Sequence, residues 1–600
     1  MRRSTIFLST LFIFSTVSSF TNKRSNSFPY KAANLNERQA AEHLLNRFTF
    51  GVRNEDIDEA LKMGLEKWFE NQLKGQLPDE NLEYRLKSYD ALKLSNSEIV
   101  EKYPLGAQLR QRAIREGLID KNEIGNNKEK LKKVYKEYFE KEGIQTSKEL
   151  ERQTVNQKIL RAIYSKNQLN EVLTDFWFNH FNVFMGKNTS TQFVLSYERD
   201  AIRPNVTNKF EDILIATAKS PAMLTYLDNF LSTKEEEENT KFKNKRKEKG
   251  LNENYAREIM ELHTLGVDGG YTQSDVLAAA KILTGWTVFP MRQKGASNQI
   301  ANLIDKIGED KLASRGFVHE GDFLFSANRH ESGPKIVLGK TYNQGGIAEG
   351  MALLKDLANH KATAQFISKK LATRFVNDNP DNKIVNAMAS TFLKTKGDIK
   401  KVLWTMVKTK EFWEAEAIHQ KTKSPFEYAI SAIRSMNAEV LYPFALANWI
   451  SKMGQKIYYY SAPTGFPDQG KYWINTGSLL NRMNFGLELA NGKIAGIKFN
   501  FTDLLNHKEP ESAEDAIEKY AFIFLPERDL QKTINRLIPL VNDANINEKI
   551  KEATKTSPNQ EMKNEEIEKL EDRKDKPGEH NKMLAQAIGI IIGSPEFQRK

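Results

Sequence analysis

Apolar residues recur at helical spacing along most of this chain, and that pattern limits the possible folds more than any other feature. Leu44, Leu45 and Phe48 follow it near the start of the chain, and amphipathic segments of the same kind continue to the end. Extended signals are few and short, for instance Phe323–Phe325 and Ile336–Leu338. The sequence therefore predicts a mostly α fold, a large multi-helix domain with a few short β-hairpins.

The first twenty residues have the pattern of a secretory signal peptide. Met1-Arg2-Arg3 is a charged start, an apolar run extends from Ile6 to Val17, and small residues follow at Ser18 and Ser19. The apolar run is shorter than the roughly 20 residues that a membrane span needs. An N-terminal membrane anchor is the alternative. We expect a signal peptide over 1–20, a polar linker over 21–35, and an exported protein, periplasmic or extracellular, with no later transmembrane segment.

Cysteine is absent from all 600 residues. Thiol chemistry and Cys-based metal sites are therefore excluded, although export would permit disulfides. A divalent metal would need carboxylates and some of the nine His residues. The net charge of +11 is spread through stretches that mix Lys with Glu, such as Lys128 to Lys148, which are typical of solvated surfaces. With no aromatic–basic recognition motif, we expect no nucleic-acid partner.

Three polar stretches are predicted to be mobile insertions, because they contain too little apolar surface to form a core. They lie near 95–150, 232–250 and 545–582. The aromatic-rich segments between them carry the candidate sites. The sequence contains no P-loop, Rossmann glycine pattern, HExxH or G-x-S-x-G motif, which disfavours the ordinary nucleotide-binding and hydrolase classes.

The most distinctive chemical feature is a polar stripe on the apolar helix expected from Asn254 to Gly266. At about 100° per residue, Asn254, Arg257, Glu258 and Glu261 share one face. The carboxylates can hold a cation or share a proton, with Arg257 beside them. Alternatively, Arg257 pairs with Glu261 at i,i+4 and only ties helices together. His263 points nearly opposite Glu261, so it is left out of the site.

A Gly/Pro loop provides a second group of candidates. His330 is suited to act as a general base or metal ligand, and Lys335 is suited to steady an anion. The alternative is a turn with exposed charges. Nearby, Thr272 and Asp275 have the spacing of a helix capping box, and we expect that structural role for Asp275.

Two aromatic segments could contribute to binding. Asp175, Asn179 and Asn182 form a polar stripe at i, i+4, i+7 that could face the carboxylates of the 254–261 helix, while His180 is expected to be a core histidine. In the Pro/Gly loop from Ala462 to Asn475, Tyr472 and Trp473 could stack on a sugar or peptide. Plain packing of the loop is the alternative. Asn254, Asn179, Trp473 and Tyr472 are the candidate substrate-binding residues.

At these segments the sequence resembles the bacterial family catalogued as domain of unknown function 1800. The matching stretches cover nearly the whole mature chain in order: His43–Gly51, Phe176–Val183, Asn254–Gly266, Gly270–Thr272, Asp275–Trp286, His330–Gly339, Ala362–Phe375, Gly465–Pro467, Trp473–Asn475 and Ser594–Gln598. The resemblance implies one large helical domain over 36–600, export, and a sulfatase-like secreted partner encoded nearby. It implies no established reaction.

The family's recurrent residues correspond here to Asn254, Arg257, Glu258, Glu261, His330, Gly333 and Lys335. Family members often carry Phe where this chain has His263, which agrees with leaving His263 out of the site.

Two classes of function compete. As an enzyme, the protein would place Glu258, Glu261 and His330 around one pocket, with Arg257 and Lys335 beside them and a divalent metal as an option, and would act on a polymer outside the cytoplasm. As a non-catalytic envelope protein, it would bind a partner protein or a polysaccharide, and Tyr472 or Trp473 would be exposed beside polar groups.

Overall fold

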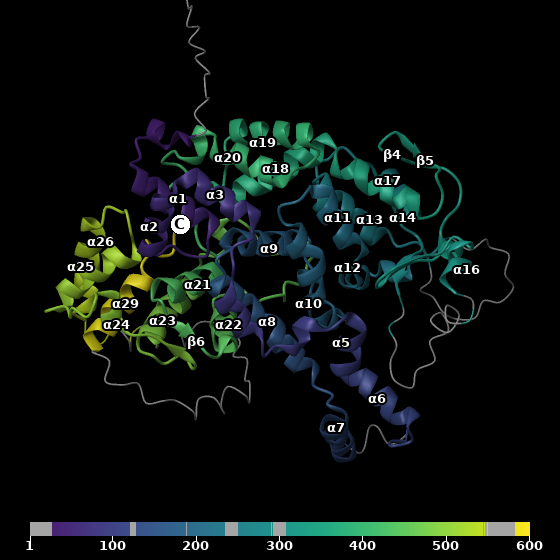
Figure 1. The fold of residues 1–600 in the computed structure, drawn as a ribbon, viewed down its shortest axis with the longest axis horizontal. Coiled ribbons are helices and arrows are strands. Elements are labelled where there is room, and N and C mark those ends of the chain that lie inside the picture. The colour runs from purple at the N-terminus through teal and green to yellow at the C-terminus, as the bar shows by residue number, and fades with distance from the viewer. Residues whose placement is uncertain are drawn as a thin grey trace, which may run out of the picture.

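The computed structural model describes residues 27–120, 128–187, 189–234, 250–289, 308–543 and 582–600, with a few single residues between them. The expected signal peptide, the first part of the expected linker, and most of the expected insertions at 232–250 and 545–582 lie outside the described residues. Helices dominate the rest, which confirms the mostly α fold (Figure 1).

The first half of the chain supplies the centre of the molecule and one projecting arm. Its α-helices are α1 (Glu37–Phe48), α2 (Asn54–Met63), α3 (Leu65–Lys74), α4 (Glu80–Leu86), α5 (Asn96–Lys102), α6 (Gly106–Arg115), α7 (Lys128–Glu142), α8 (Ser147–Tyr164), α9 (Gln168–His180), α10 (Val194–Ser196), α11 (Phe210–Lys219), α12 (Pro221–Tyr226), α13 (Glu253–Glu258) and α14 (Gln273–Ile282). Two of these helices continue as π-helical turns, α10 into Tyr197–Ile202 and α13 into Ile259–Thr264.

The second half closes the core from both sides. Its helices are α16 (Glu309–Ala313), α17 (Ile347–Ala358), α18 (Lys361–Phe375), α19 (Asn382–Thr395), α20 (Ile399–Val407), α21 (Pro425–Ser435), α22 (Pro443–Lys452), α23 (Thr476–Ala490), α24 (Phe501–Leu504), α25 (Ala513–Phe524), α26 (Gln531–Val541) and α29 (Lys582–Gly593). In Figure 1, α23 to α29 lie at one end of the molecule and α14 and α17 at the other, with α8 and α9 between them.

The strands are short and antiparallel. One sheet has the order β1 (Trp286–Val288), β3 (Phe323–Phe325), β2 (Val318–Glu320), and two pairs join β4 (Lys335–Val337) to β5 (Lys340–Tyr342) and β6 (Glu439–Val440) to β7 (Ile497–Lys498). The two strand signals in the sequence therefore correspond to β3 and, displaced by one residue, to β4.

One continuous hydrophobic core contains residues from Phe28 to Phe597. Phe28 lies in the expected linker, yet it packs against Phe69, Trp404 and Trp413, so the linker does not extend to residue 35. None of the helices in the described part of the chain combines the length and hydrophobicity that a membrane crossing needs.

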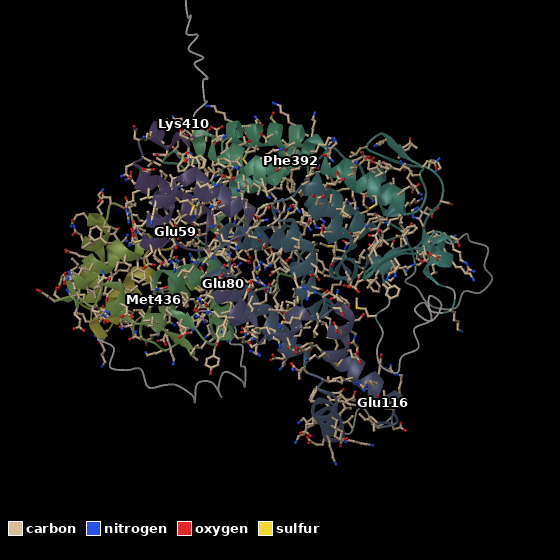
Figure 2. The ribbon with its side chains drawn as sticks, in the orientation of Figure 1. Glu59, Glu80, Glu116, Phe392, Lys410 and Met436 are labelled. Carbon is tan, nitrogen blue, oxygen red and sulfur yellow. The ribbon has the colours of Figure 1, made fainter. Side chains whose placement is uncertain are left out.

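The expectation that 95–150 contains too little apolar surface to form a core is wrong for its described residues. Helices α6 and α7 form an arm that projects from the body, with Glu116 at the end of α6 (Figures 1 and 2). The arm has a small core of its own, which includes Leu109, Val134 and Tyr138. A single face of each charged helix supplies this core, and composition summed over the segment does not reveal such a face.

Candidate functional site

The polar stripe on α13 does not follow one regular helical face. The backbone changes from α- to π-helical hydrogen bonding after Glu258, and a π-turn rotates every later side chain relative to a 3.6-residue helix. Arg257 consequently pairs with Glu253, at 3.6 Å, and not with Glu261. Glu261 instead accepts a hydrogen bond of 3.1 Å from the Tyr271 hydroxyl. Asn254, at the start of α13, is exposed.

Glu258 is the one stripe residue with the properties of an acid–base group. Burial, with a further contribution from the Glu261 charge, raises the pKa of the Glu258 carboxyl, although Arg257 opposes the shift. No hydrogen bond to this carboxyl exists among the described residues. A carboxyl with a raised pKa is a candidate proton donor. His263 is buried behind the stripe, and burial lowers its pKa to about 3, so it is neutral.

His330 and Lys335 meet a third residue that the sequence did not indicate. Lys335 Nζ lies 2.7 Å from Glu349 Oε2, and His330 Nε2 lies 3.3 Å from the same oxygen. All three side chains are buried. Lys335 also donates to the Glu331 carbonyl, and the Gly345 amide donates to the other Glu349 oxygen. This is a closed ionic cluster that fixes β4 on α17, and within the described residues no hydrogen bond or ion pair joins it to Glu258.

The structure also tests the expected roles of Thr272, Asp275 and His180. Thr272 and Asp275 form the predicted capping box at the start of α14. His180 is a core histidine, as expected, and lies 3.1 Å from the His263 carbonyl. Within the described residues, no three His, Asp or Glu side chains are placed so that they could hold a metal ion together.

The polar face of α9 anchors a loop. Asn179 donates 2.8 Å to the Phe466 carbonyl and accepts 2.7 Å from the Phe466 amide, while Asn182 donates to the carbonyls of Tyr460 and Ala462. The α9 stripe therefore faces residues 460–468 and not the 254–261 carboxylates. Gly465 has a positive φ of 71°, and a Cβ there would overlap the Asn179 carbonyl, so this close approach requires glycine.

A small pocket lies beneath this loop, and we call it the Arg374 pocket. Its volume for water-sized groups is about 60 Å³. Two predicted binding residues, Asn179 and Trp473, lie in its wall, whereas Tyr472, the next residue of the loop, is 57% exposed. The remaining wall residues that matter for charge are Lys158, Asp175, Arg374, Lys421, Glu427 and Asp468.

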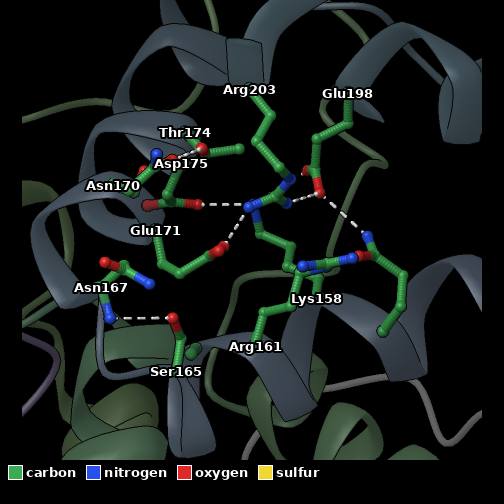
Figure 3. A network of polar contacts seen from close by, with 12 residues as sticks. Lys158, Arg161, Ser165, Asn167, Asn170, Glu171, Thr174, Asp175, Glu198 and Arg203 are labelled. Atoms are coloured by element: carbon green, nitrogen blue, oxygen red, sulfur yellow. Dashed lines mark hydrogen bonds and ion pairs between the residues drawn. The ribbon is translucent and has the colours of Figure 1, made fainter. Parts of the chain in front are cut away.

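A buried ionic network supports one wall of the pocket (Figure 3). Lys158 lies 2.9 Å from Asp175 and 3.5 Å from Glu198, and Arg203 lies 2.8 Å from Glu198 and also pairs with Glu171. Burial alone would raise the pKa of Glu198, but the charges of Lys158 and Arg203 outweigh it and lower that pKa to about 2. Glu198 is thus ionised, and the ion pairs of the network fix Lys158 and Asp175 in place.

Arg374 on α18 is a wall residue whose donors are not all used within the described part of the chain. Its Nη1 lies 2.7 Å from Glu427 and its Nη2 lies 3.8 Å from Asp175, beyond hydrogen-bond distance. Arg374 is 9% exposed, and neither its Nε nor its Nη2 has a hydrogen-bond partner in the described part of the chain. Unpaired buried donors are costly, so a guanidinium held this way is suited to bind an acceptor.

The family model for a protein of unknown function, DUF1800, matches residues 43–599. The chain belongs to the DUF1800 family. Neither the curated proteins nor the solved structures contain a match.

The fold brings several of the stretches that carry the DUF1800 resemblance together in space. Segments 176–183, 362–375, 465–467 and 473–475, four of the stretches that carry the resemblance, all contribute to the wall of the Arg374 pocket. The stretches 254–266 and 330–339 lie around α14 instead.

Sequence reasoning missed Arg374, Lys158 and Glu427 as site residues. Arg374 could have been noticed, because it is a charged residue within one of the stretches that carry the DUF1800 resemblance. Glu427 could only be read as a capping residue, since Ser424 and Glu427 also form a capping box.

Proposed function

We propose that this DUF1800 protein is an exported binding protein that holds an acidic group of an extracellular polysaccharide in the Arg374 pocket. The observation that carries the proposal is a pair of buried Arg374 donors at the pocket wall that have no hydrogen-bond partner among the residues the structure describes. A planar guanidinium fork matches carboxylate and sulfate oxygens in both geometry and charge.

The size of the pocket limits what enters it. A cavity needs about 10–15 Å³ of such volume for each water-sized group, so the roughly 60 Å³ of the Arg374 pocket accommodates about four to six heavy atoms. This is enough for one carboxylate or sulfate group and too little for a sugar ring. The remainder of the ligand would lie outside, where the exposed Tyr472 ring and Lys471 flank the pocket.

The charges favour binding over catalysis at this pocket. Burial opposes ionisation of Glu427, but Arg374 and Lys600 hold its pKa well below the usual range. Asp175 lies 2.9 Å from the Lys158 ammonium. Carboxylates held ionised by cations make poor proton donors.

The test is affinity electrophoresis in gels containing polygalacturonate, with dextran gels as the neutral reference. We expect the wild-type protein to be retarded by polygalacturonate only, and Arg374→Met to lose most of that retardation. Glu427 keeps Lys600 and Asp175 keeps Lys158 in this variant, so the fold should survive.

Two further variants make the result specific. Arg374→Lys keeps the charge without the fork and should bind at least tenfold more weakly than wild type, whereas Arg536→Met, which removes a surface arginine, should bind normally. The proposal would be refuted if wild type and Arg374→Met were retarded equally. It would also be refuted if wild type were retarded neither by polygalacturonate nor by carrageenan, a sulfated polysaccharide.

Catalysis at Glu258 is the second candidate function, and the raised pKa of this half-buried carboxyl is the observation that favours it. If it is right, wild type releases reducing ends from the bound polymer and Glu258→Gln binds the polymer without releasing them. Release that persists in Glu258→Gln excludes this role.

Export is part of the proposal and is tested separately. Expression of the full chain in a Gram-negative host, followed by N-terminal sequencing of the periplasmic protein, should give a chain that begins near residue 20. Retention of Met1 would instead indicate a membrane anchor or a cytoplasmic protein.

A further inference from the structure

A second and much larger cavity lies between the N-terminal helices and the body of the molecule. It has a volume of about 640 Å³, within the range of about 300–1,000 Å³ typical of small-molecule sites. Its walls come from α2, α3 and α4 on one side and from the end of α8 and the segment following α21 on the other. Glu59, labelled in Figure 2, is one of the wall residues. We call it the N-terminal cavity.

The wall formed by residues 77–81 is held firmly. Asp79 accepts 2.6 Å hydrogen bonds from the Ser165 hydroxyl and the Lys166 amide, and a third bond from Asn167. Asn167 in turn exchanges two hydrogen bonds with the Leu77 backbone. The turn between α8 and α9 thus fixes the opposite wall, so the cavity is preformed.

The floor of the cavity is an ionic cluster that is already satisfied. Asp56 lies 2.6 Å from Arg53 and 3.1 Å from Arg434. Arg434 is buried and also donates to the carbonyls of Gly51 and Ile163. The charged residues of the whole cavity wall are the cations Arg53, Arg85, Lys166 and Arg434 and the carboxylates Asp56, Glu59 and Glu439, so the cations exceed the carboxylates by one.

The rim of the cavity adds further cations next to aromatic side chains. The Arg85 guanidinium lies 4.0 Å above the Tyr164 ring, and its nearest carboxylate, on Glu439, is at 3.6 Å. Lys166 is an exposed residue of the same wall. Trp68 and Leu45 supply apolar wall beside these groups.

We propose that the N-terminal cavity binds a small organic anion that combines a ring with an acid group. The ring would lie against Trp68 and Tyr164, and the acid group would face Arg85 and Lys166. Cations at a partly desolvated aromatic wall recognise this combination, because each half of the ligand meets its matching surface. The site is separate from the Arg374 pocket and does not depend on the function proposed for it.

The experiment is a fluorescence titration of the full-length protein with 1-anilinonaphthalene-8-sulfonate, a ring-bearing sulfonate, followed by competition. Wild type should bind one equivalent of the probe at micromolar concentration. Trigalacturonate and phenylacetate serve as the two competitors, because they distinguish a sugar acid from an aromatic acid as the natural source of the same chemistry.

Two variants locate the binding. Arg85→Gln removes a partly exposed cation, and Asn81→Trp places a large side chain at the cavity wall from an exposed position, so neither change should disturb the core. Each should weaken probe binding at least tenfold with an unchanged circular dichroism spectrum. Arg374→Met should bind the probe like wild type.

Three outcomes would overturn the inference. They are no saturable binding by wild type, binding that Arg85→Gln and Asn81→Trp both leave intact, and a loss of binding in Arg374→Met that equals the loss in Arg85→Gln. Displacement of the probe by neither competitor would refute the proposed ligand class.

Discussion

Individual buried charges in this protein are balanced by partners that are distant in sequence. Glu427 on α21 binds Arg374 of α18 and Lys600, whose backbone pairs with Lys421. A buried ion that loses its partner costs about 3–5 kcal/mol, so such clusters fix the relative positions of the segments that supply them. They also make the stability of the fold sensitive to pH.

Lys600 gives a prediction for that pH dependence. Burial lowers the pKa of its ammonium from 10.5 to about 7, although Glu427 opposes the shift. Between these pH values the unfolded chain holds a proton on Lys600 that the folded chain lacks, so this residue makes the free energy of unfolding increase with pH across that window. Below pH 7 both states are protonated, and Lys600 contributes no slope.

In Lys600→Met that contribution disappears. Urea unfolding midpoints measured from pH 6 to pH 9 should therefore rise less with pH above pH 7 than they do for wild type. Lys532→Met, which removes an exposed lysine, should follow the wild-type curve. Parallel curves for wild type and Lys600→Met would contradict the assignment.

At the scale of elements, helix termini and π-turns position the side chains of both candidate sites. The π-turn Tyr197–Ile202 contains Glu198, and the π-turn Ile259–Thr264 follows directly on Glu258. Helix α9 ends at His180, and Asn179 just before this end and Asn182 just after it anchor residues 460–468. The position of this loop determines the size of the Arg374 pocket.

Asn179→Ala tests the anchoring. Removing the side chain leaves the Phe466 amide and carbonyl unpaired, and a buried unpaired group costs about 1–3 kcal/mol. Hydrogen–deuterium exchange should become at least tenfold faster over 460–468, while α8 stays protected. Asn542→Ala, which removes a surface amide, is the control. Unchanged exchange in the loop would mean that Asn179 does not hold it.

At the scale of the whole molecule, one core unites nearly the entire described chain, and the α6–α7 arm stands apart from it. The arm has its own small core, and its two ends are adjacent because the Gln145 amide donates 2.7 Å to the Lys102 carbonyl. Units of this kind commonly open and close independently of the rest of a fold.

Excision of residues 106–143, replaced by a short Gly-Ser linker, should therefore leave the body folded. We expect the melting temperature to change by less than about 3 °C, since the main core is intact. Binding to polygalacturonate should equal that of the full chain, as measured by the same electrophoresis. A variant that fails to fold, judged by circular dichroism, would show that the arm stabilises the main core.

The local signals in the sequence predicted a good part of this structure. Helical periodicity predicted the mostly α fold, the capping spacing of Thr272 and Asp275 predicted the start of α14, and β3 falls on its predicted residues. The π-turn after Glu258 could not be predicted by assuming 3.6 residues per turn throughout the helix. Because of this turn, Arg257 forms an ion pair with Glu253 instead of the expected pair with Glu261. The single apolar face of α7 was not recognised, because the composition of the whole segment is dominated by charged residues.

What the sequence determined by itself is the helical class, the caps, the absence of cysteine chemistry and the presence of polar residues on apolar helices. Those properties depend on residues a few positions apart. The tertiary structure alone decided which polar residues meet. It paired Lys335 and His330 with Glu349, directed Asn179 to a loop nearly 290 residues away, and left Arg374 with unused donors. Long-range ion pairs of this kind form only when the shared core brings distant segments together, and no local pattern records them.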